Sequence, residues 1–564
     1  MTHDDWGNRL CRYPAEFSAT YRAEGMWSDI PTAERFHRIA LAHPQRPAVI
    51  APDGEITYAE LDLRTDQIAA GLHDLGLTPG EPVLFQLDNA LSSIVAWYGT
   101  LKAGLIPVAT LAAHRQHEIN AISARVGAVA HIVDGASTKF DFVDFALAQA
   151  ASSPTMRHVL TTGRFMQSPH PVTSVELLGT AIEPGVARQT VERIQAGIDP
   201  EDIAVFQLSG GTTGTPKVIP RIHAEYWNNA LFYSQRLERT EATRVAHLLP
   251  FIHNAGIVCA VHAAHAVGGC LVLPPAHPAA ALDFMVQAKV TDFLLVAAFA
   301  DAMKTDAAEA LLNGLDTIVW AGSKLPAWVH DTAARHDVWI GQLFGMAEGF
   351  FTTSRRDSPT QARQTCVGDP LTPSDELRIF KVGSTIEAPT GEIGEIACRG
   401  PYTIRGYFDA DEHNRGAFTS DGFYRTGDLG RIVHFDTPHL SIEGRIKDVI
   451  SRGGEKINAE EVELLLLQND AIADAAVVAM PDERLGERAC AYLVATTTSV
   501  DLSVIQQHLD RLGVAKYKWP ERLVWVDSIP RTNVTKVDKV FLRQNISRII
   551  DRETRISGSV DNPG

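Results

Sequence analysis

Apolar positions recur with two different spacings along the first two-thirds of the chain. From Tyr58 to Leu75 they return at helix-like intervals, and the turn sequence Thr78-Pro-Gly-Glu follows. A short apolar run typical of a buried strand comes next at 83–87, and similar runs stand at 130–133, 271–273, 293–296 and 317–320. Strands separated by helical patterns predict layered α/β structure with parallel sheets.

The pattern changes near residue 390, where glycines separate short alternating strands. These glycines are Gly391, Gly394, Gly400, Gly406, Gly422 and Gly427. They predict a β-rich subdomain, and a helix at 459–468, a strand at 475–480 and a helix at 502–512 predict a small α+β domain after it. We therefore expect a large N-terminal domain over 1–444, a hinge at 445–447, a small mobile C-terminal domain over 448–549 and a disordered tail over 550–564.

Two long apolar stretches resemble membrane spans at first sight. The first, 92–113, is interrupted by Lys102 and Pro107, and the second, 255–273, contains His262 and His265. Both are better interpreted as a buried helix followed by a strand. The acidic N-terminus also lacks the basic and then apolar order of a secretory signal. We expect a cytoplasmic protein with no membrane partner.

Composition narrows the class of function. The 564 residues include 51 Lys and Arg against 68 Asp and Glu, a net charge of −17, which disfavours general binding of nucleic acid. The hydrophobic fraction of 45% is typical of a globular protein, and the length requires more than one domain. The cysteines show no CxxC spacing, which disfavours a zinc site or a disulfide framework. They are Cys11, Cys259, Cys270, Cys366, Cys398 and Cys490.

The strongest chemical signal follows the apolar run that ends at Leu208. Here Ser209-Gly-Gly-Thr-Thr-Gly-Thr-Pro-Lys217 combines glycines, hydroxyl side chains and a lysine. Glycines let backbone N–H groups approach phosphate oxygens, and hydroxyls and Lys217 add donors and charge. The segment is not a Walker A loop, because Pro216 precedes the lysine and Val218 follows it. The alternative is a flexible polar surface loop, which this density of donors disfavours.

Three further segments point in the same direction. Glu348 lies among small residues, as a magnesium ligand beside a nucleotide would, and Asp428 follows a turn from which it could accept from two ribose hydroxyls. The segments 443–448 and 451–456 place charges around glycines at the expected hinge. Each of these features alone would suit a solvated structural turn.

Together the segments resemble one family. The order SGGTTGTPK, GMAEG, YRTGD, EGRIKD and a late lysine is that of the acyl-adenylate-forming superfamily. The stretches QLSGGTTGTPKVIPR, LPFIHN and RGPYTIRGY are most similar to stand-alone aryl acid–AMP ligases, the 2,3-dihydroxybenzoate and salicylate ligases of siderophore assembly. The resemblance extends from about Gly25 to Arg543 and implies a two-domain ligase that uses ATP and Mg²⁺.

The resemblance implies a role for each matching residue. Lys217, Glu348 and Lys536 would be catalytic, with Glu348 as the Mg²⁺ ligand and Lys536 as the lysine of the small domain. Lys447 stands at the family's hinge, and Thr535 departs from the glycine more usual there. The residues expected around ATP are Ser209, Gly210, Gly211, Thr212, Thr213, Gly214, Lys217, Gly322, Ser323, Leu343, Gly345, Met346, Ala347, Asp428, Arg445 and Lys536.

The expected acid pocket departs from the dihydroxybenzoate pattern. The resemblance gives Asn254 a hydrogen bond to an ortho-hydroxyl group, but Ala255 replaces a tyrosine and Cys259 replaces a serine, as in salicylate-type ligases. Ala321 and Phe351 stand where the family has glycine and valine. The full set is His253, Asn254, Ala255, Cys259, Ala321, Gly322 and Phe351. Salicylate, a hydroxyanthranilate and 3-hydroxypicolinate all fit this pattern, each with an ortho-hydroxyl or ortho-amino group.

The implied function is ATP-dependent adenylation of such an acid, giving an aryl-AMP and pyrophosphate. The acyl group would then pass to the phosphopantetheine thiol of a carrier protein in siderophore or nonribosomal peptide biosynthesis. Two alternatives remain at this point: an aryl-CoA synthetase that uses free coenzyme A, and an inactive nucleotide-binding or scaffold protein. Retention of Glu348, Asp428, Arg445 and Lys536 argues against the second alternative.

Overall fold

The fold is described from a computed structural model over residues 6–163, 172–209, 216–452, 455–482, 484–512, 514, 516–532 and 536–558. Within these ranges the chain forms two compact units. Unit 1 comprises Met1–Leu377, Cys398–Tyr424 and His434–His439, and unit 2 comprises Arg378–Ala397, Arg425–Val433 and Leu440–Gly564. Two stretches before residue 444 thus group with the C-terminal residues, and a functional hinge at 445–447 stays a prediction.

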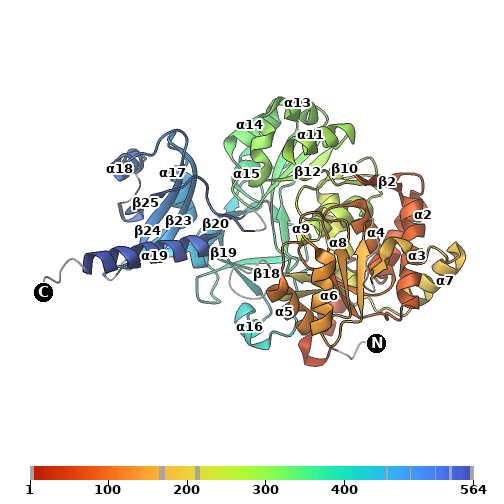
Figure 1. The fold of residues 1–564 in the computed structure, drawn as a ribbon. Coiled ribbons are helices and arrows are strands. Elements are labelled where there is room, and N and C mark those ends of the chain that lie inside the picture. The colour runs from red at the N-terminus through yellow and green to blue at the C-terminus, as the bar shows by residue number, and fades with distance from the viewer. Residues whose placement is uncertain are drawn as a thin grey trace. The chain divides into compact units, whose positions relative to one another are not determined.

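One sheet of unit 1 has the order β16-β15-β14-β13-β12-β10-β11-β1-β2 (Figure 1). Its middle strands are parallel, and antiparallel pairs close both edges. The strands are β1 (Pro47–Ala51), β2 (Gly54–Thr57), β10 (Arg244–Ala246), β11 (Cys270–Val272), β12 (Asp292–Val296), β13 (Thr317–Ala321), β14 (Trp339–Gly345), β15 (Phe351–Thr353) and β16 (Asp369–Pro370). The predicted strands at 271–273, 293–296 and 317–320 are confirmed, and their continuous apolar character reflects burial on both faces.

A second sheet of unit 1 has the order β7-β6-β5-β3-β4-β8-β9. Its strands are parallel except for the antiparallel pair β8 and β9. The strands are β3 (Pro82–Gln86), β4 (Ile106–Ala109), β5 (Ala130–Asp134), β6 (His158–Thr162), β7 (Thr173–Ser174), β8 (Ile203–Leu208) and β9 (Val218–Ile222). The expected layered α/β class is therefore confirmed.

Unit 1 also contains helices. They are α1 (Ala15–Ala23), α2 (Thr32–Ala42), α3 (Tyr58–Asp74), α4 (Leu91–Lys102), α5 (Gln116–Val126), α6 (Phe142–Ser152), α7 (Pro184–Gln195), α8 (His223–Arg236), α9 (Asn254–Gly256), α10 (His262–Ala266), α11 (Pro278–Gln287), α12 (Ala297–Ala300), α13 (Asp306–Leu312), α14 (Ala327–Arg335), α15 (Thr360–Thr365) and α16 (Asp411–Ala417). Helix α3 matches the predicted helix because a capping box fixes its start. The Thr57 hydroxyl accepts from the Glu60 N–H, and the Glu60 carboxylate accepts from the Thr57 N–H.

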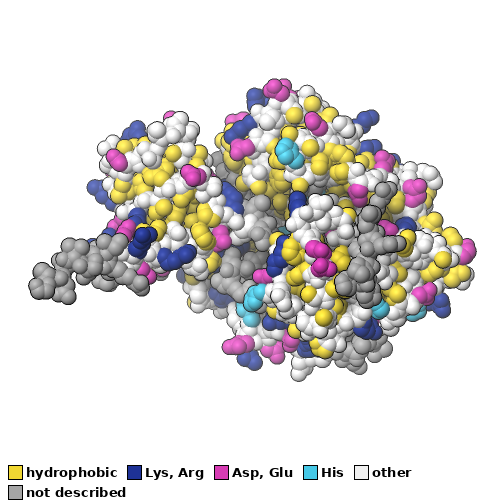
Figure 2. Space-filling view, in the orientation of Figure 1, with side chains coloured by type: hydrophobic (Ala, Val, Ile, Leu, Met, Phe, Trp, Pro, Cys, Tyr) yellow, Lys and Arg dark blue, Asp and Glu magenta, His cyan; other side chains and the backbone are white. Residues whose placement is uncertain are grey.

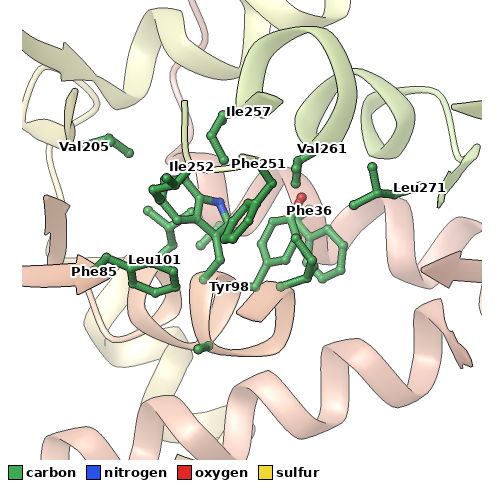
Figure 3. Close-up of a cluster of buried hydrophobic side chains, with 14 of the residues drawn as sticks. Phe36, Phe85, Tyr98, Leu101, Val205, Phe251, Ile252, Ile257, Val261 and Leu271 are labelled. Atoms are coloured by element: carbon green, nitrogen blue, oxygen red, sulfur yellow. The ribbon is translucent and has the colours of Figure 1, made fainter. Parts of the chain in front are cut away.

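The two apolar stretches that could suggest membrane spans are internal helix–strand units. Helix α4 leads into β4, and α10 leads into β11. Helices α4 and α10 contribute side chains to a large aromatic and aliphatic core, in which Phe36 stacks on Tyr98 with ring centroids 4.0 Å apart (Figure 3). Within the described ranges, no helix is long and apolar enough to cross a bilayer.

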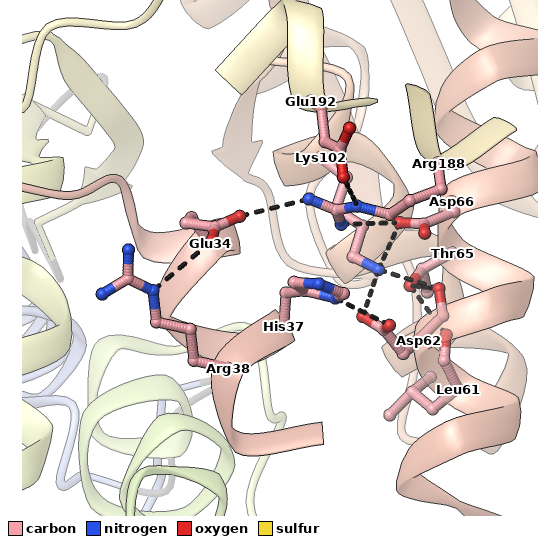
Figure 4. A network of polar contacts seen from close by, with 10 residues as sticks. All are labelled: Glu34, His37, Arg38, Leu61, Asp62, Thr65, Asp66, Lys102, Arg188 and Glu192. Atoms are coloured by element: carbon pink, nitrogen blue, oxygen red, sulfur yellow. Dashed lines mark hydrogen bonds and ion pairs between the residues drawn. The ribbon is translucent and has the colours of Figure 1, made fainter. Parts of the chain in front are cut away.

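A buried charged cluster ties four helices of unit 1 together (Figure 4). The Lys102 side chain on α4 is fully buried, and its Nζ lies 2.6 Å from a carboxylate oxygen of Asp62 and 2.6 Å from one of Asp66, both on α3. His37 of α2 contacts Asp62 at 2.8 Å, and Arg188 of α7 approaches Asp66 at 3.5 Å. Two carboxylates thus compensate a cation that has lost its water, as a buried charge requires.

Strands β17 to β20 form a sheet in that order and carry the glycine-punctuated segment. They are β17 (Glu376–Phe380), β18 (Gly394–Arg399), β19 (Tyr424–His434) and β20 (Pro438–Arg445). A sheet of unit 2 has the order β22-β21-β24-β23, with β25 beside β24. Its elements are β21 (Val449–Arg452), β22 (Glu455–Asn458), α17 (Ala459–Leu466), β23 (Ile472–Asp482), β24 (Gly486–Ala495), α18 (Leu502–Arg511), β25 (Arg522–Trp525) and α19 (Lys539–Gly558). The predicted β-rich and small α+β parts are confirmed.

The chain's last helix is longer than the sequence suggests. We expect a disordered tail from residue 550, but α19 continues to Gly558. Leu542 and Ile546 are buried in a cluster that also includes Ile549 and Ile550. This i, i+4, i+7, i+8 spacing gives the helix an apolar stripe facing the sheet.

On the face shown in Figure 2, acidic and basic side chains are interspersed with apolar ones.

Candidate active site

The expected phosphate loop connects two paired strands of unit 1. Strands β8 and β9 run antiparallel, with Leu208 opposite Val218. The base of the loop is closed because the Ser209 N–H donates to the Lys217 carbonyl and the Lys217 N–H donates to Ser209 Oγ, both at 3.0 Å. The remaining predicted loop residues, Gly210, Gly211, Thr212, Thr213 and Gly214, lie outside the described residues.

The proposed magnesium ligand Glu348 is buried beside two tyrosines. Its Oε1 accepts from the Tyr407 hydroxyl at 2.6 Å and from the Tyr424 hydroxyl at 3.4 Å. Burial and the nearby Glu348 carboxylate raise the pKa of Tyr407, so its hydroxyl stays a neutral donor. The Lys217 Nζ lies 5.2 Å from the centroid of the Tyr407 ring, which brings the predicted lysine and the predicted carboxylate to the same place.

One carboxylate alone suits a magnesium ion shared with phosphates. Oε2 of Glu348 has no hydrogen-bond partner among the described residues, and no group of three or more His, Cys, Asp or Glu side chains in those residues could hold a metal. Mg²⁺ is commonly held by one or two carboxylates together with substrate phosphates and water. The donor set around Glu348 therefore fits the ion.

The residues expected beside adenine and the aryl ring lie at the ends of β13 and β14. These parallel strands pair Ala321 with Leu343. Gly322 follows with φ +86°, a left-handed conformation that favours glycine, and the Trp320 indole N–H fixes the turn by donating to the Ser323 carbonyl at 2.7 Å. A Cβ on Gly322 would meet no atom within 4 Å, so its surroundings are open.

The next turn holds the GMAEG segment against Phe351. Strand β14 pairs with β15 so that Gly345 lies opposite Phe351, and a Cβ on Gly345 would lie 2.4 Å from that ring. The Met346 carbonyl accepts from the Gly349 N–H at 3.1 Å. The glycine at 345 is therefore required for the close packing of Phe351, one of the predicted pocket residues.

The expected acid-binding residues between His253 and Cys259 lie on or beside a short, irregular helical stretch. His253 precedes α9 and accepts from the Ala255 N–H, and a π-helical stretch, Ile257–Val261, follows. Cys259 lies in its middle, where its carbonyl accepts from Arg239 Nη1 at 2.8 Å. Local π-helices occur often at functional sites. Burial raises the pKa of the Cys259 thiol to about 12, so the thiol is a neutral, weak donor.

Asn254 is buried, and its side-chain oxygen accepts two hydrogen bonds. Its Oδ1 accepts from the Tyr226 hydroxyl at 3.1 Å and from Arg221 Nη1 at 3.2 Å. Its Nδ2 donates to the Met346 carbonyl at 3.3 Å, and Arg221 Nη1 also donates to the Ala347 carbonyl at 3.1 Å. The predicted acid-binding asparagine is thus joined to the predicted nucleotide-binding turn.

The nucleotide-binding residues predicted near the hinge belong to unit 2. Arg445 Nε lies 2.8 Å from Asp428 Oδ1, so the predicted ribose-binding carboxylate pairs with the predicted phosphate-binding arginine. Burial, together with Arg445, lowers the pKa of Lys447. Arg543 donates to the Lys447 carbonyl and pairs with Asp448. These contacts tie the predicted hinge to α19.

Lys536 lies at the base of a small loop before α19. Its carbonyl accepts from the Thr532 N–H at 2.7 Å, and Arg531 and Val537 form a β-bridge next to it. The side chain of Lys536 is exposed, and Thr535 lies outside the described residues. An exposed cation on a closed loop is suited to meeting a ligand.

Two models of known protein families match these same regions. The AMP-binding enzyme model matches residues 36–408, and the AMP-binding enzyme C-terminal domain model matches residues 461–536. The chain belongs to the AMP-binding enzyme family. Its catalytic class, an ATP-dependent adenylate-forming ligase, agrees with the expectation from the motifs.

Relatives of this AMP-binding enzyme match it over nearly its whole length. The salicyl-AMP ligase / salicyl-S-ArCP synthetase of Mycobacterium tuberculosis is 38% identical over 538 residues, covering 93% of each chain. Pyochelin synthase PchD of Pseudomonas aeruginosa is 36% identical over 549 residues, covering 96% of each. The apo structure of MbtA from Mycobacterium smegmatis superposes with a TM-score of 0.70 at 35% identity, covering 95% of this chain and 98% of that one. The resemblance to aryl acid–AMP ligases is confirmed.

The sequence of this AMP-binding enzyme points to Asn254 and Glu348 but not to the side chains that position them. Arg221 and Tyr407 have no predicted role. Both, however, are the final residues of the motifs QLSGGTTGTPKVIPR and RGPYTIRGY, which carry the resemblance. Their membership of these motifs could have indicated a functional role, but only the fold shows which residue each one contacts.

Proposed function

We propose that this enzyme adenylates a small aromatic acid bearing an ortho substituent, and then transfers the acyl group to the phosphopantetheine thiol of a carrier protein. The observation that carries the proposal is the buried carboxamide of Asn254, bonded to the Met346 carbonyl of the nucleotide-binding turn. Full-length relatives named as salicyl-AMP and 2,3-dihydroxybenzoate-AMP ligases support an aromatic acid. Such relatives also support a place in siderophore or nonribosomal peptide biosynthesis.

The acid would lie between the π-helical stretch and the ends of β13 to β15. Asn254 would meet the ortho substituent, and Cys259, Ala321 and Phe351 would line the ring. Cys259 offers only a weak thiol donor, since its raised pKa keeps it protonated. A ring with a single ortho-hydroxyl group, as in salicylate, needs fewer hydrogen-bond partners on the Cys259 side of the pocket than a dihydroxylated ring.

Each part of ATP would contact one of the segments that carry the family motifs. Its phosphates would lie along the loop from Ser209 to Lys217, its adenine beside Gly322, Ser323 and Leu343, and its ribose hydroxyls on Asp428. Mg²⁺, when bound at Glu348, would neutralise phosphate charge. Tyr407 would hold the other oxygen of that carboxylate, leaving Oε2 for the ion.

The first half-reaction joins two anions. A carboxylate oxygen attacks the α-phosphorus, a new O–P bond forms, and the bond from that phosphorus to the bridging oxygen breaks as pyrophosphate leaves. Negative charge grows on the phosphoryl oxygens, so fixed cations lower the barrier. Lys217, Arg445 and Lys536 supply this charge in the proposal.

The second half-reaction replaces the phosphate with sulfur. The thiol of the carrier's phosphopantetheine loses its proton and attacks the acyl carbon, a C–S bond forms, and AMP leaves with the electrons of the C–O bond. Rotation of the small domain about Lys447 would exchange Lys536 for the loop at 453–454. That loop lies outside the described residues.

Acid-dependent exchange of radioactive pyrophosphate into ATP tests the first half-reaction. A panel of benzoates, anthranilates and picolinates should give strong exchange with one ortho-substituted aromatic acid, lost in Lys536→Ala. Exchange with aliphatic or amino acids alone would overturn the acid assignment. The rates of thioester formation with a phosphopantetheinylated aryl carrier protein and with free coenzyme A then identify the acceptor. A preference for coenzyme A would show that the enzyme is an aryl-CoA synthetase.

A further inference from the structure

The N-terminal segment 13–28 is hydrogen-bonded to the RGPYTIRGY motif through two aromatic side chains. The Tyr13 hydroxyl donates to the Thr403 carbonyl at 2.7 Å. The indole N–H of Trp27 donates to the Pro401 carbonyl at 2.8 Å. Both carbonyls belong to buried residues, and neither accepts another hydrogen bond from the described part of the chain. The two aromatic donors are therefore what satisfies the motif backbone on this side.

The segment that carries these donors is fixed separately from the motif. Asn228 of α8 donates from Nδ2 to the Met26 carbonyl at 2.9 Å, which ties the segment to that helix. The rings of Tyr13 and Trp27 pack edge to face, with centroids 4.9 Å apart, so the two donors are also held relative to each other. The family model matches the chain only from residue 36 onward, and no sequence motif gives the segment a role.

On its other side, the RGPYTIRGY motif contacts both the backbone and the side chain of Glu348. The Ile404 N–H donates to the Glu348 carbonyl at 2.9 Å, and the Tyr407 hydroxyl donates to the Glu348 carboxylate at 2.6 Å. The Tyr402 carbonyl lies so close to Gly349 that a Cβ there would be 1.6 Å from its oxygen. Because the two backbones pack this tightly, a shift of the motif would move Glu348 as well.

We propose that Tyr13 and Trp27 are positioning residues for the magnesium-binding carboxylate of Glu348, and that they act through the RGPYTIRGY motif. The inference rests on the proposed function, which gives Glu348 its ion, and it adds the N-terminal segment to the parts of the chain that adenylation requires. Neither aromatic residue makes a hydrogen bond to Glu348 itself. Their effect on the ion is therefore indirect.

Two conservative substitutions remove the donors one at a time. Tyr13→Phe deletes a single hydroxyl and leaves the Thr403 carbonyl without a partner. Trp27→Phe keeps an aromatic ring and leaves the Pro401 carbonyl without a partner. A buried carbonyl that loses its hydrogen bond is costly, so we expect the motif backbone to relax away from its position beside Glu348.

The matched control is Tyr402→Phe, which deletes a hydroxyl from the same contact. The Tyr402 hydroxyl donates in the opposite direction, from the motif to the Met26 carbonyl at 3.2 Å. That carbonyl keeps its bond from Asn228 in the variant. The control therefore removes a buried hydroxyl without leaving any carbonyl of the motif unpaired.

Mn²⁺ binding measures the position of the carboxylate without turnover. The ion is titrated into enzyme that holds a non-hydrolysable ATP analogue, and free Mn²⁺ is followed by electron paramagnetic resonance. Residues that orient a metal ligand directly, as Tyr407 does, typically change metal affinity by about 10-fold or more. One step further away, we expect the Kd for Mn²⁺ to rise about 3-fold in Tyr13→Phe and in Trp27→Phe, and to stay at the wild-type value in Tyr402→Phe.

Hydrogen exchange of the metal-free enzyme reports on the motif itself. The N–H groups of Ile404 and Phe408 donate to the carbonyls of Glu348 and Val218, both at 2.9 Å. A relaxed motif opens these bonds more often, so a peptide covering 399–408 should exchange faster in Tyr13→Phe than in wild type. Tyr402→Phe should exchange at the wild-type rate.

The outcomes separate this inference from the proposed function. Wild-type Mn²⁺ affinity in both Tyr13→Phe and Trp27→Phe would overturn the inference, even if the variants unfold at a lower temperature, because that pattern shows a purely structural role. An equal rise of the Kd in Tyr402→Phe would overturn it too. Absence of acid-dependent pyrophosphate exchange in the wild-type enzyme would instead overturn the proposed function, and Mn²⁺ binding would still decide the inference. If Trp27→Phe does not fold, Tyr13→Phe decides alone.

Discussion

The hydroxyl of Tyr407 donates to Oε1 of Glu348 at 2.6 Å, so a residue from the RGPYTIRGY motif holds the carboxylate of the GMAEG motif. Tyr407→Phe would leave only the longer bond from Tyr424, at 3.4 Å. We expect the Mg²⁺ concentration for half-maximal pyrophosphate exchange to rise about 10-fold, because residues that orient a metal ligand typically affect metal affinity by that order. Titration of exchange with Mg²⁺ at saturating ATP measures the effect.

The matched control for this substitution is Tyr402→Phe. Tyr402 is also a buried tyrosine, and its hydroxyl contacts the Met26 carbonyl at 3.2 Å, away from Glu348. It should leave the Mg²⁺ titration unchanged. An equal shift in both variants would show that loss of a buried hydroxyl, and not the orientation of Glu348, changes the requirement.

Lys536→Ala should lower the rate of pyrophosphate exchange by about 10²–10³-fold, the usual effect of removing one well-placed donor to developing charge. Because the Lys536 side chain is exposed, the Lys536→Ala variant should unfold at the same midpoint temperature as the wild-type enzyme. Lys516→Ala, another lysine of unit 2, should retain full exchange. Full activity in Lys536→Ala would remove this lysine from the catalytic site.

Cys259→Ser should shift preference toward dihydroxylated acids. A serine hydroxyl is a stronger donor and acceptor than a thiol whose pKa is raised to about 12 by burial. We expect the ratio of kcat/KM for 2,3-dihydroxybenzoate over salicylate to rise about 3- to 10-fold, the effect of one gained hydrogen bond. Cys366→Ser, at another buried cysteine, is the control, and the same acid profile in all three proteins would contradict the pocket assignment.

Lys102→Met should destabilise unit 1 without touching the active site. It leaves the buried carboxylates of Asp62 and Asp66 without their shared cation, a change that typically costs about 3–5 kcal/mol. Urea unfolding followed by tryptophan fluorescence at neutral pH measures it. Lys304→Met, which breaks an exposed pair with Asp301, should have no measurable effect. A small loss in Lys102→Met would mean that water or neighbouring residues compensate the carboxylates.

Asp375 gives the stability of unit 1 a specific pH dependence. Burial raises the pKa of this carboxyl from 3.8 to about 7, although the Thr372 hydroxyl and N–H both donate to it. The folded form therefore favours the protonated acid. This contribution to stability is complete below about pH 4 and is lost as the pH rises through about 7.

Asp375→Asn should remove that dependence, because the amide keeps an oxygen for Thr372 and never ionises. Relative to wild type, the free energy of unfolding of the variant should rise on the order of 2 kcal/mol between pH 5 and pH 7. Urea unfolding at pH 5, 6, 7 and 8 measures this difference, with the exposed Asp331→Asn as control. A difference that is constant across these pH values would show that Asp375 does not titrate in the folded state.

The features predictable from sequence are those fixed by nearby residues. Helix α3 follows from its apolar spacing and the Thr57 and Glu60 cap, and the buried strands follow from short apolar runs between turns. In the π-helical stretch, by contrast, the Cys259 carbonyl accepts from the guanidinium of Arg239, which lies in the loop after α8. Nothing in the local sequence encodes such a bond.

The same limit applies to the candidate site. Motifs indicate Asn254, Glu348, Asp428 and Lys536 one by one, because each stands in a recognisable segment. The bonds that orient them join residues far apart in sequence, such as Arg221 and Ala347, or Glu348 and Tyr407. Spacing along the chain does not reveal these contacts, since they form only after distant strands and turns pack together.

The buried, protonated state of Cys259 has a consequence for self-protection. An acyl-adenylate is a strong electrophile, and in the proposed arrangement it forms beside a cysteine of its own enzyme. Only a thiolate would attack it at an appreciable rate, and a pKa of about 12 keeps that form scarce at neutral pH. In that arrangement the enzyme would hold an activated acyl group next to its own sulfur without acylating itself, which would preserve the intermediate for an incoming thiol.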